Sequence, residues 1–247
     1  MNVTPTQREY LSRTEIASRV ARMLQHVFPS GYSTELPMPL DEIYAVLRDR
    51  YKIRFIFNQP LGSLNNGNKI LGMFSVSPLT IRIDPCLEMW SGRFRFTLAH
   101  EIGHLSLHRD LIGKGKYIPR DKPLVDTARQ LKYREMAALS DLDWVEWQAN
   151  EFAMALILPH GYMLNTVVAY QHKRGVTRFL GSMRLDDQPC NIQDCLGLVS
   201  RISTEININP SMIWKRLRYL GILHDARSGR MKTAFEEMDA LFSTRSG

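Results

Sequence analysis

The sequence predicts an α+β fold, in which a small, mostly antiparallel or mixed sheet packs with helices and a small helical region follows. Two observations support this prediction. Apolar residues recur first at helical spacing, then alternate as they do in strands, and finally return to helical spacing. The chain has 247 residues and is 44% hydrophobic, so it can bury a full core as one large domain, or as one domain with an appendage.

Two helices and three strands are expected before the most informative motif. The helices are predicted over residues 9–27 and over residues 40–51, which follow a proline. The strands are predicted over residues 52–57, 70–76 and 79–83.

The alternation continues through residues 80–84, which suggests an edge strand lying across the functional site. Such an edge can hold an extended peptide. The alternative is an ordinary strand inside the sheet.

The most informative motif is His100-Glu101-Ile102-Gly103-His104. Positions four apart share one face of a helix, so His100 and His104 can bind one metal ion, and Glu101 can reach a water at its open position. Two His ligands and a Glu general base are typical of a zinc site on the active-site helix of a zincin-like domain. An apolar stripe at helical spacing supports the helix: Phe94, Leu98, Ile102 and Leu105. The alternative is an ordinary helix surface.

A third protein ligand is needed, and the apolar, helix-forming residues 144–159 contain the candidates. Glu146 and Asn150 are four apart, so a Glu146 carboxylate on the metal can lie beside an Asn150 oxygen that accepts the outer N–H of a ligating His. Glu151 competes, but it projects about 100° away from Asn150. Helix geometry therefore favours Glu146, and the alternative is a surface Glu on an amphipathic helix.

His108 continues the series of His100 and His104, but a straight helix rises about 12 Å over eight residues. His108 is therefore not expected to bind the same ion. It is interpreted as a helix-end histidine near the carbonyl dipole, with lining of the cleft as the alternative.

Residues 95–108, RFTLAHEIGHLSLH, resemble the signature of the ImmA/IrrE metallopeptidases, and residues 146–159 are similar to that family's second motif. The resemblance covers about residues 12–222. It implies a zinc peptidase of the gluzincin type, with His100, His104 and Glu146 as Zn²⁺ ligands and Glu101 as the base. It also implies a helix-turn-helix repressor as the protein substrate. Residues 109–143, between the motifs, look longer than is usual.

Domain organisation follows from loops and composition. Residues 109–143 are predicted to be an insertion or lid within a peptidase domain of residues 1–189, with a helix over residues 127–139. A further helix is predicted over residues 161–170, and residues 184–189 are interpreted as a linker.

Residues 190–247 are predicted to be a helical, helix-turn-helix-like region. A helix over residues 196–202, a turn at residues 207–211 and a basic helix over residues 212–220 carry this prediction. Lys215, Arg216 and Arg218 would then contact DNA phosphates. The alternative is that the apolar stripe of the last helix simply packs on the peptidase: Ile213, Trp214, Leu217 and Leu220.

Composition limits the cellular compartments and the partners that are expected for this protein. Three cysteines without Cys-x-x-Cys spacing predict buried thiols in a reducing cytosol: Cys86, Cys190 and Cys195. The sequence contains no long apolar run and begins without a signal-peptide core, so a cytoplasmic protein without a membrane partner is expected. The net charge of +7 favours an acidic partner but does not establish DNA binding.

The function predicted from these features is site-specific cleavage of an intracellular protein, with Glu101 as general base. An oxyanion donor is also required, and four side chains are candidates: Tyr162, His160, His172 and His108. One alternative is a transcriptional regulator or interaction protein, of a mobile element or toxin–antitoxin-like system, that keeps the metal fold without cleavage. Another is a structural zinc domain, which does not need Glu101.

Overall fold

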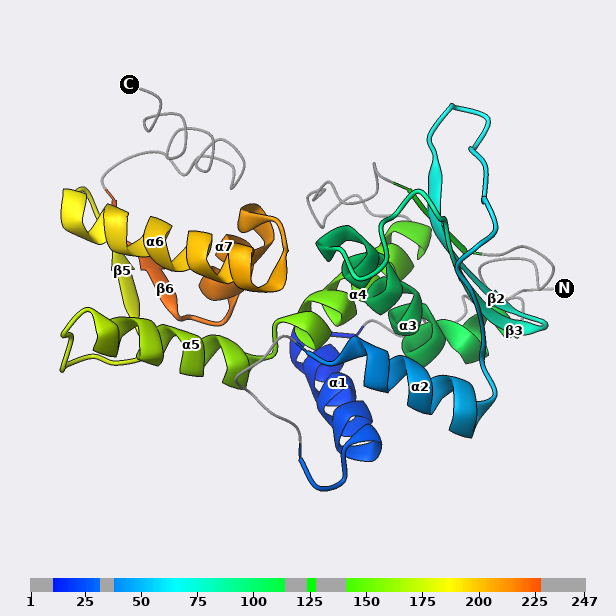
Figure 1. Ribbon diagram of the computed structural model, residues 1–247, viewed down its shortest axis with the longest axis horizontal. Helices are drawn as coiled ribbons and strands as arrows, with labels where there is room; N and C mark the ends of the chain where they lie inside the picture. Colours follow the sequence, from blue (N-terminus) through cyan, green and yellow to red (C-terminus); the bar gives the residue numbers. More distant parts are fainter. Residues whose placement is uncertain (1–10, 32–37, 114–123, 128–140, 228–247) are drawn as a thin grey trace, which may run out of the picture. The chain divides into compact units, whose positions relative to one another are not determined.

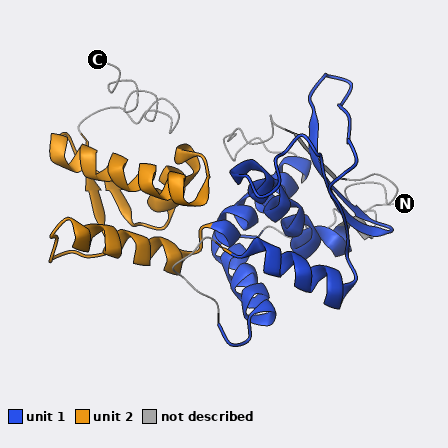
Figure 2. Ribbon diagram, viewed as in Figure 1, with its two compact units in different colours: residues 1–31, 39–157 blue, residues 32–38, 158–247 orange. Residues whose placement is uncertain are grey.

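The computed structural model describes residues 11–31, 38–113, 124–127 and 141–227. These residues form two compact units, shown in different colours in Figure 2. The first holds the described residues of 1–31 and 39–157, and the second those of 32–38 and 158–247. The division therefore falls after residue 157, whereas the sequence predicted a boundary after residue 189.

The first unit begins with two helices that follow the predicted periodicity. Helix α1 (Arg13–Val27) starts with a capping box, in which Ser12 and Glu15 each accept a hydrogen bond from the other's backbone N–H. Its buried face consists of Ile16, Val20 and Leu24. Helix α2 (Leu40–Tyr51) has the predicted bounds and follows Pro39. The first residues of the predicted 9–27 helix lie outside the described residues.

The sheet of this unit is mixed and has the strand order β1-β3-β2-β4. Its strands are β1 (Arg54–Ile56), β2 (Ile70–Val76), β3 (Leu79–Ile83) and β4 (Leu124–Thr127). Strand β3 runs parallel to β1, and β2 is antiparallel to both β3 and β4. This mixed sheet and the surrounding helices confirm the α+β fold.

The predicted edge strand is wrong, because β3 pairs with β1 on one side and with β2 on the other. Among the described strands, the edges of this sheet are β1 and β4. Strand β4 comes from the predicted insertion at residues 109–143. Apart from Thr127, which ends β4, the helix predicted over residues 127–139 lies outside the described residues.

Two helices carry the residues of the metal motif into the core of the first unit. Helix α3 (Gly92–Gly113) packs against β2 and β3 and, on another side, against α4 (Asp141–Ile157), as Figure 1 shows. The approach of α3 to α4 is close at Gly103, where an added Cβ would lie 3.2 Å from the Ala149 backbone. Glycine thus allows the two helices to bring their polar side chains together.

The described residues of the second unit form three helices and a two-stranded parallel sheet. Its elements are α5 (His160–Lys173), β5 (Met183–Leu185), α6 (Pro189–Ile206), α7 (Pro210–Tyr219) and β6 (Leu223–Asp225). The helices cover the segments predicted to be helical, except Leu220, which is the C-cap of α7.

Helix α5 belongs to this unit because Gln171 ties it to the turn before β5. The Gln171 Nε2 atom donates to the Ser182 carbonyl at 2.7 Å, and its Oε1 atom accepts from the Gly181 N–H at 2.7 Å. The predicted linker at residues 184–189 is also corrected, because its first residues pair in β5 with β6. Cys86 and Cys190 are exposed, so the expectation of buried thiols holds for Cys195 alone.

Candidate metal centre

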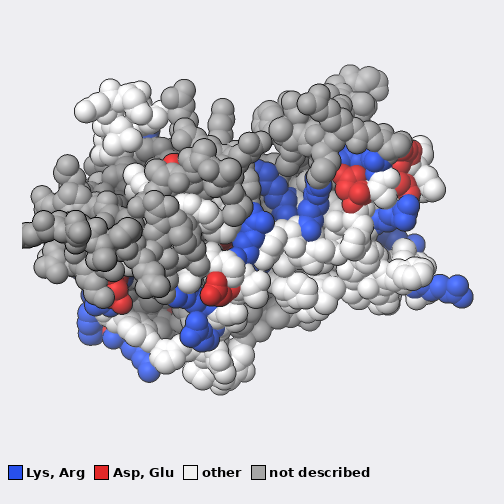
Figure 3. Space-filling view, turned by 180° about the vertical axis from the view of Figure 1, so that it is seen from behind, with Lys and Arg blue, Asp and Glu red and all other residues white. Residues whose placement is uncertain are grey.

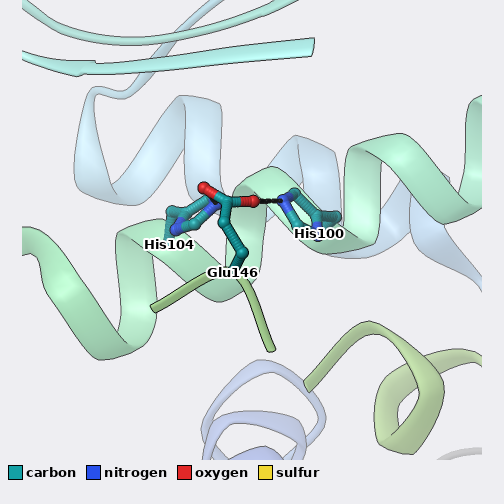
Figure 4. Close-up of side chains that lie close together, drawn as sticks. All are labelled: His100, His104 and Glu146. Atoms are coloured by element: carbon teal, nitrogen blue, oxygen red, sulfur yellow. Dashed lines mark hydrogen bonds and ion pairs between the residues drawn. The ribbon is translucent and has the colours of Figure 1, made fainter. Parts of the chain in front are cut away.

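Three predicted ligands from two helices converge in the first unit. Helix α3 presents His100 and His104 on one face, and α4 presents Glu146 opposite them, with its carboxylate between the two rings (Figure 4). The Nε2 atoms of His100 and His104 lie 3.3 Å and 3.6 Å from the two Glu146 oxygens. The two Nε2 atoms lie 2.9 Å apart. All three side chains are buried.

Asn150 sets the protonation of His100. Its Oδ1 atom lies 3.0 Å from the His100 Nδ1 atom. An amide oxygen only accepts hydrogen bonds, so His100 carries its proton on Nδ1 and keeps a lone pair on Nε2. This contact has the geometry predicted for Asn150 one turn after Glu146. Its consequence is that the lone pair of His100 points toward the carboxylate of Glu146.

His108 and Gln148 set the protonation of His104 in the same way. The His108 Nε2 atom lies 3.0 Å from Gln148 Oε1, and its Nδ1 atom lies 3.0 Å from His104 Nδ1. Burial, and next the neighbouring His104, lower the pKa of His108 to about 3, so its ring is neutral. His108 therefore donates from Nε2 to Gln148 and accepts at Nδ1 from His104, which leaves the lone pair of His104 on Nε2.

The interpretation of His108 as a helix-end residue is wrong. Helix α3 continues to Gly113, and His108 is buried between His104 and Gln148. Both of its ring nitrogens are engaged, so it is not an oxyanion donor. Sequence analysis missed Gln148, because it lies on a different face of α4 from Glu146 and Asn150. The four-residue step from His104 to His108 was the signal that could have predicted the contact between these two rings.

The donor set fits a zinc ion. Two imidazole lone pairs and a carboxylate point toward one another, an arrangement that repels unless a cation lies among them. Ligand distances of about 2.0–2.2 Å around a tetrahedral zinc ion place neighbouring donors roughly 3.3 Å apart, close to the observed Glu146 spacings.

The second candidate ligand, Glu151, is placed elsewhere. Its Oε1 atom lies 3.2 Å from the Nε atom of Arg13 on α1. It does not join the group formed by His100, His104 and Glu146. Glu101, the predicted base, follows His100 on α3 and is fully buried.

The remaining oxyanion candidates lie on α5, in the second unit. His160 and His172 are exposed there. Tyr162 is buried, and burial, with a smaller contribution from Glu205, raises the pKa of its hydroxyl. Their proposed role therefore stays a prediction.

The predicted nucleic-acid contact is corrected at Arg216, which is buried and donates from Nε to the Leu158 carbonyl at 2.9 Å. Arg218 is half-buried, with Nη1 4.0 Å from Asp225 Oδ2, and Lys215 alone is exposed. Three residues of the apolar stripe of α7, Ile213, Trp214 and Leu217, are buried, and α7 packs against α6 and β6 of its own unit. Packing of this stripe on the peptidase stays a prediction. On the face shown in Figure 3, basic side chains of the described residues form separate groups interrupted by acidic and uncharged ones.

No single helix of the described segments combines the length and the apolar character needed to cross a membrane; consecutive helices at residues 142–157 and 160–173 meet that test only as a bent pair.

Comparison with known proteins agrees with the geometry of the site. Residues 78–182 match the family described as the IrrE N-terminal-like domain, a segment that includes α3, α4 and the whole of α5. None of the curated proteins matches the chain. The motif resemblance and the match cover the same ligand-bearing helices. The match supports a metallopeptidase-like domain of the ImmA/IrrE type at residues 78–182 of this chain.

Proposed function

We propose that this protein is a zinc-dependent endopeptidase that cuts an intracellular protein at one site. The observation that carries this proposal is the convergence of His100, His104 and Glu146, with the buried Glu101 directly after His100 on α3. Two nitrogens and one carboxylate oxygen are a donor set that suits zinc, and three protein ligands leave a position open for chemistry.

The bound zinc would supply Lewis acidity, which polarises a peptide carbonyl and lowers the pKa of water. Glu101 takes the proton from the attacking water and passes it to the leaving amine. Asn150, together with the His108–Gln148 pair, holds the two ligating rings in the tautomer that presents Nε2. The protein therefore contributes a preset ligand geometry and a proton carrier.

Two alternatives keep the metal and omit the reaction. A structural zinc site normally fills its fourth position with Cys or His. Within the described residues, the His100–His104–Glu146 group includes no fourth ligand of that kind. A regulator without cleavage has no need for Glu101. This residue follows the predicted ligand His100, and burying its carboxylate is costly. Both considerations favour catalysis.

We further propose a helix-turn-helix repressor as the substrate and the cytoplasm as the place of action. The support for both is the family relationship, which is an argument by analogy. A single-site cut in a folded regulator is also compatible with an enzyme acting among other cellular proteins, because indiscriminate cleavage there would be harmful.

The test uses the full chain loaded with zinc and a helix-turn-helix repressor from the same genome, taken from a neighbouring gene where one is present. We expect one cut in the repressor, loss of its operator binding, and little or no cleavage of casein. The Glu101→Gln variant serves as the matched control, because it keeps the size and most hydrogen bonding of the side chain. Rapid digestion of many unrelated unfolded proteins, without preference for the repressor, would contradict the proposed specificity.

A further inference from the structure

We propose that Gly72 of β2 is the positioning residue for Glu101, because the absence of a side chain there leaves the space in which the carboxylate lies. This inference rests on the proposed function, in which Glu101 carries the proton. It assigns a role in the site to a residue that lies on the sheet, outside both metal-binding helices.

Gly72 lies so close to the side chains of Glu101 and Thr97 that a larger residue at position 72 would require rearrangement. A Cβ added to Gly72 would lie 2.3 Å from the Glu101 Oε1 atom and 3.1 Å from its Cδ atom. The Cγ2 atom of Thr97, one turn earlier on α3, would lie 2.7 Å away. Carbon atoms in van der Waals contact are about 3.5–4.0 Å apart, so a methyl group at position 72 displaces the carboxylate, the helix or the strand.

The backbone itself does not call for glycine at this position. The backbone at Gly72 does not have a positive φ, in contrast to Gly62 and Gly67 in the preceding loop. Gly72 lies inside a strand paired on both sides, with Ile83 of β3 and Asp126 of β4. Glycine weakens a strand interior and often marks close approach of another group. Here the approaching group is the carboxylate of the proposed base.

Burial among close neighbours restricts the position of the Glu101 carboxylate. Glu101 and Thr97 are fully buried, and Gly72 is buried as well. The strand therefore limits the carboxylate on the side of the sheet, while α3 carries Glu101 directly after the predicted ligand His100. A proton carrier must stay within hydrogen-bond reach of the atoms it serves, and misplacement by about 1 Å can cost on the order of 100-fold in rate.

The first experiment compares Gly72→Ala with the wild-type protein by steady-state cleavage and by zinc content. We expect kcat to fall on the order of 10- to 100-fold, with KM and one bound zinc per chain retained, because the ligands are untouched. Gly197→Ala is the matched control. Its added Cβ would lie 2.4 Å from the Tyr170 hydroxyl in the second unit, so it imposes a comparable overlap away from the site and should leave kcat unchanged.

A second experiment tests whether Glu101 is the group that Gly72 positions. It combines Gly72→Ala with Glu101→Asp, which shortens the side chain by one methylene group. We expect the combined loss of kcat to be smaller than the product of the two separate losses, because both variants act on the position of one group. The same non-additivity is expected in chemical unfolding of Gly72→Ala with Glu101→Ala. Thr97→Ser removes the other near atom and separates its contribution.

These outcomes distinguish this inference from the proposed function. A wild-type protein that cuts no repressor would contradict the function, whereas the unfolding cycle would still decide whether Gly72 and Glu101 share space. Independent effects of the two substitutions in unfolding would overturn the contact. An unchanged kcat for Gly72→Ala in an active, zinc-loaded enzyme would overturn the positioning role.

Discussion

The Nε atom of Arg13 lies 3.2 Å from the Oε1 atom of Glu151, so an ion pair joins α1 to α4. The Arg13 guanidinium also lies over the Trp147 ring, 5.5 Å from its centroid. The contacts of Glu151 therefore differ from those of Glu146, the other glutamate of α4. Glu151 faces α1 and links two helices, whereas Glu146 faces α3 and its histidines.

Replacing the two carboxylates separates these roles. Glu146→Ala should abolish stoichiometric zinc binding, because it removes one of three converging donors. Glu151→Ala should keep zinc and lower the free energy of unfolding by up to about 1 kcal/mol, since its ion pair is partly exposed. Metal analysis and chemical unfolding measure the two effects. Loss of zinc in the Glu151 variant alone would reverse the assignment.

Glu101→Gln should retain zinc and lose cleavage. The amide keeps the size of the side chain but cannot take a proton, and general-base catalysis contributes about 10²- to 10⁴-fold. Cleavage of the repressor by the zinc-loaded variant is the measurement. Full activity would show that Glu101 is not the base.

Replacing His108 or Gln148 should weaken zinc binding without removing a ligand. His108→Ala takes away the acceptor for His104 Nδ1–H, and loss of such an outer contact typically costs about 10- to 100-fold in metal affinity. Competition with a chelator of known affinity measures the change. The exposed His26 on α1 provides the control, since His26→Ala should leave zinc affinity unaltered.

The metal-free protein should lose stability as the pH falls below about 6.5. The pKa of His108 is lowered to about 3 in the folded protein, from an unfolded value of 6.5. Between these values the unfolded chain binds a proton that the folded chain does not, so the free energy of unfolding decreases by up to about 1.4 kcal/mol per pH unit. Unfolding at pH 7, 6 and 5 should show a shallower dependence for His108→Gln. Equal slopes for both proteins would contradict this origin.

Arg216→Ala should destabilise the second unit by about 2 kcal/mol, because it leaves the buried Leu158 carbonyl without this charged donor. Lys215→Ala, at the neighbouring exposed position, should have little effect on unfolding. An unchanged midpoint for Arg216→Ala would indicate that the hydrogen bond contributes nothing to stability.

Local spacing in the sequence by itself determined much of the first unit. The four-residue steps between His100 and His104, and between Glu146 and Asn150, depend only on the helical repeat, so their shared faces could be derived without any tertiary contact. The bounds of α2, β2 and β3 were predictable for the same reason, since periodicity and turn residues are local properties.

Only the tertiary structure decided how distant segments pair. The sequence does not show that β1 lies beside β3, which leaves β3 inside the sheet and not at its edge, or that β4 lies beside β2. Nor does it show that Gln148 meets His108, that Arg216 turns inward to Leu158, or that Gly72 faces Glu101. Each of these contacts joins residues far apart along the chain, and packing of whole elements selects among partners that local propensity leaves equivalent.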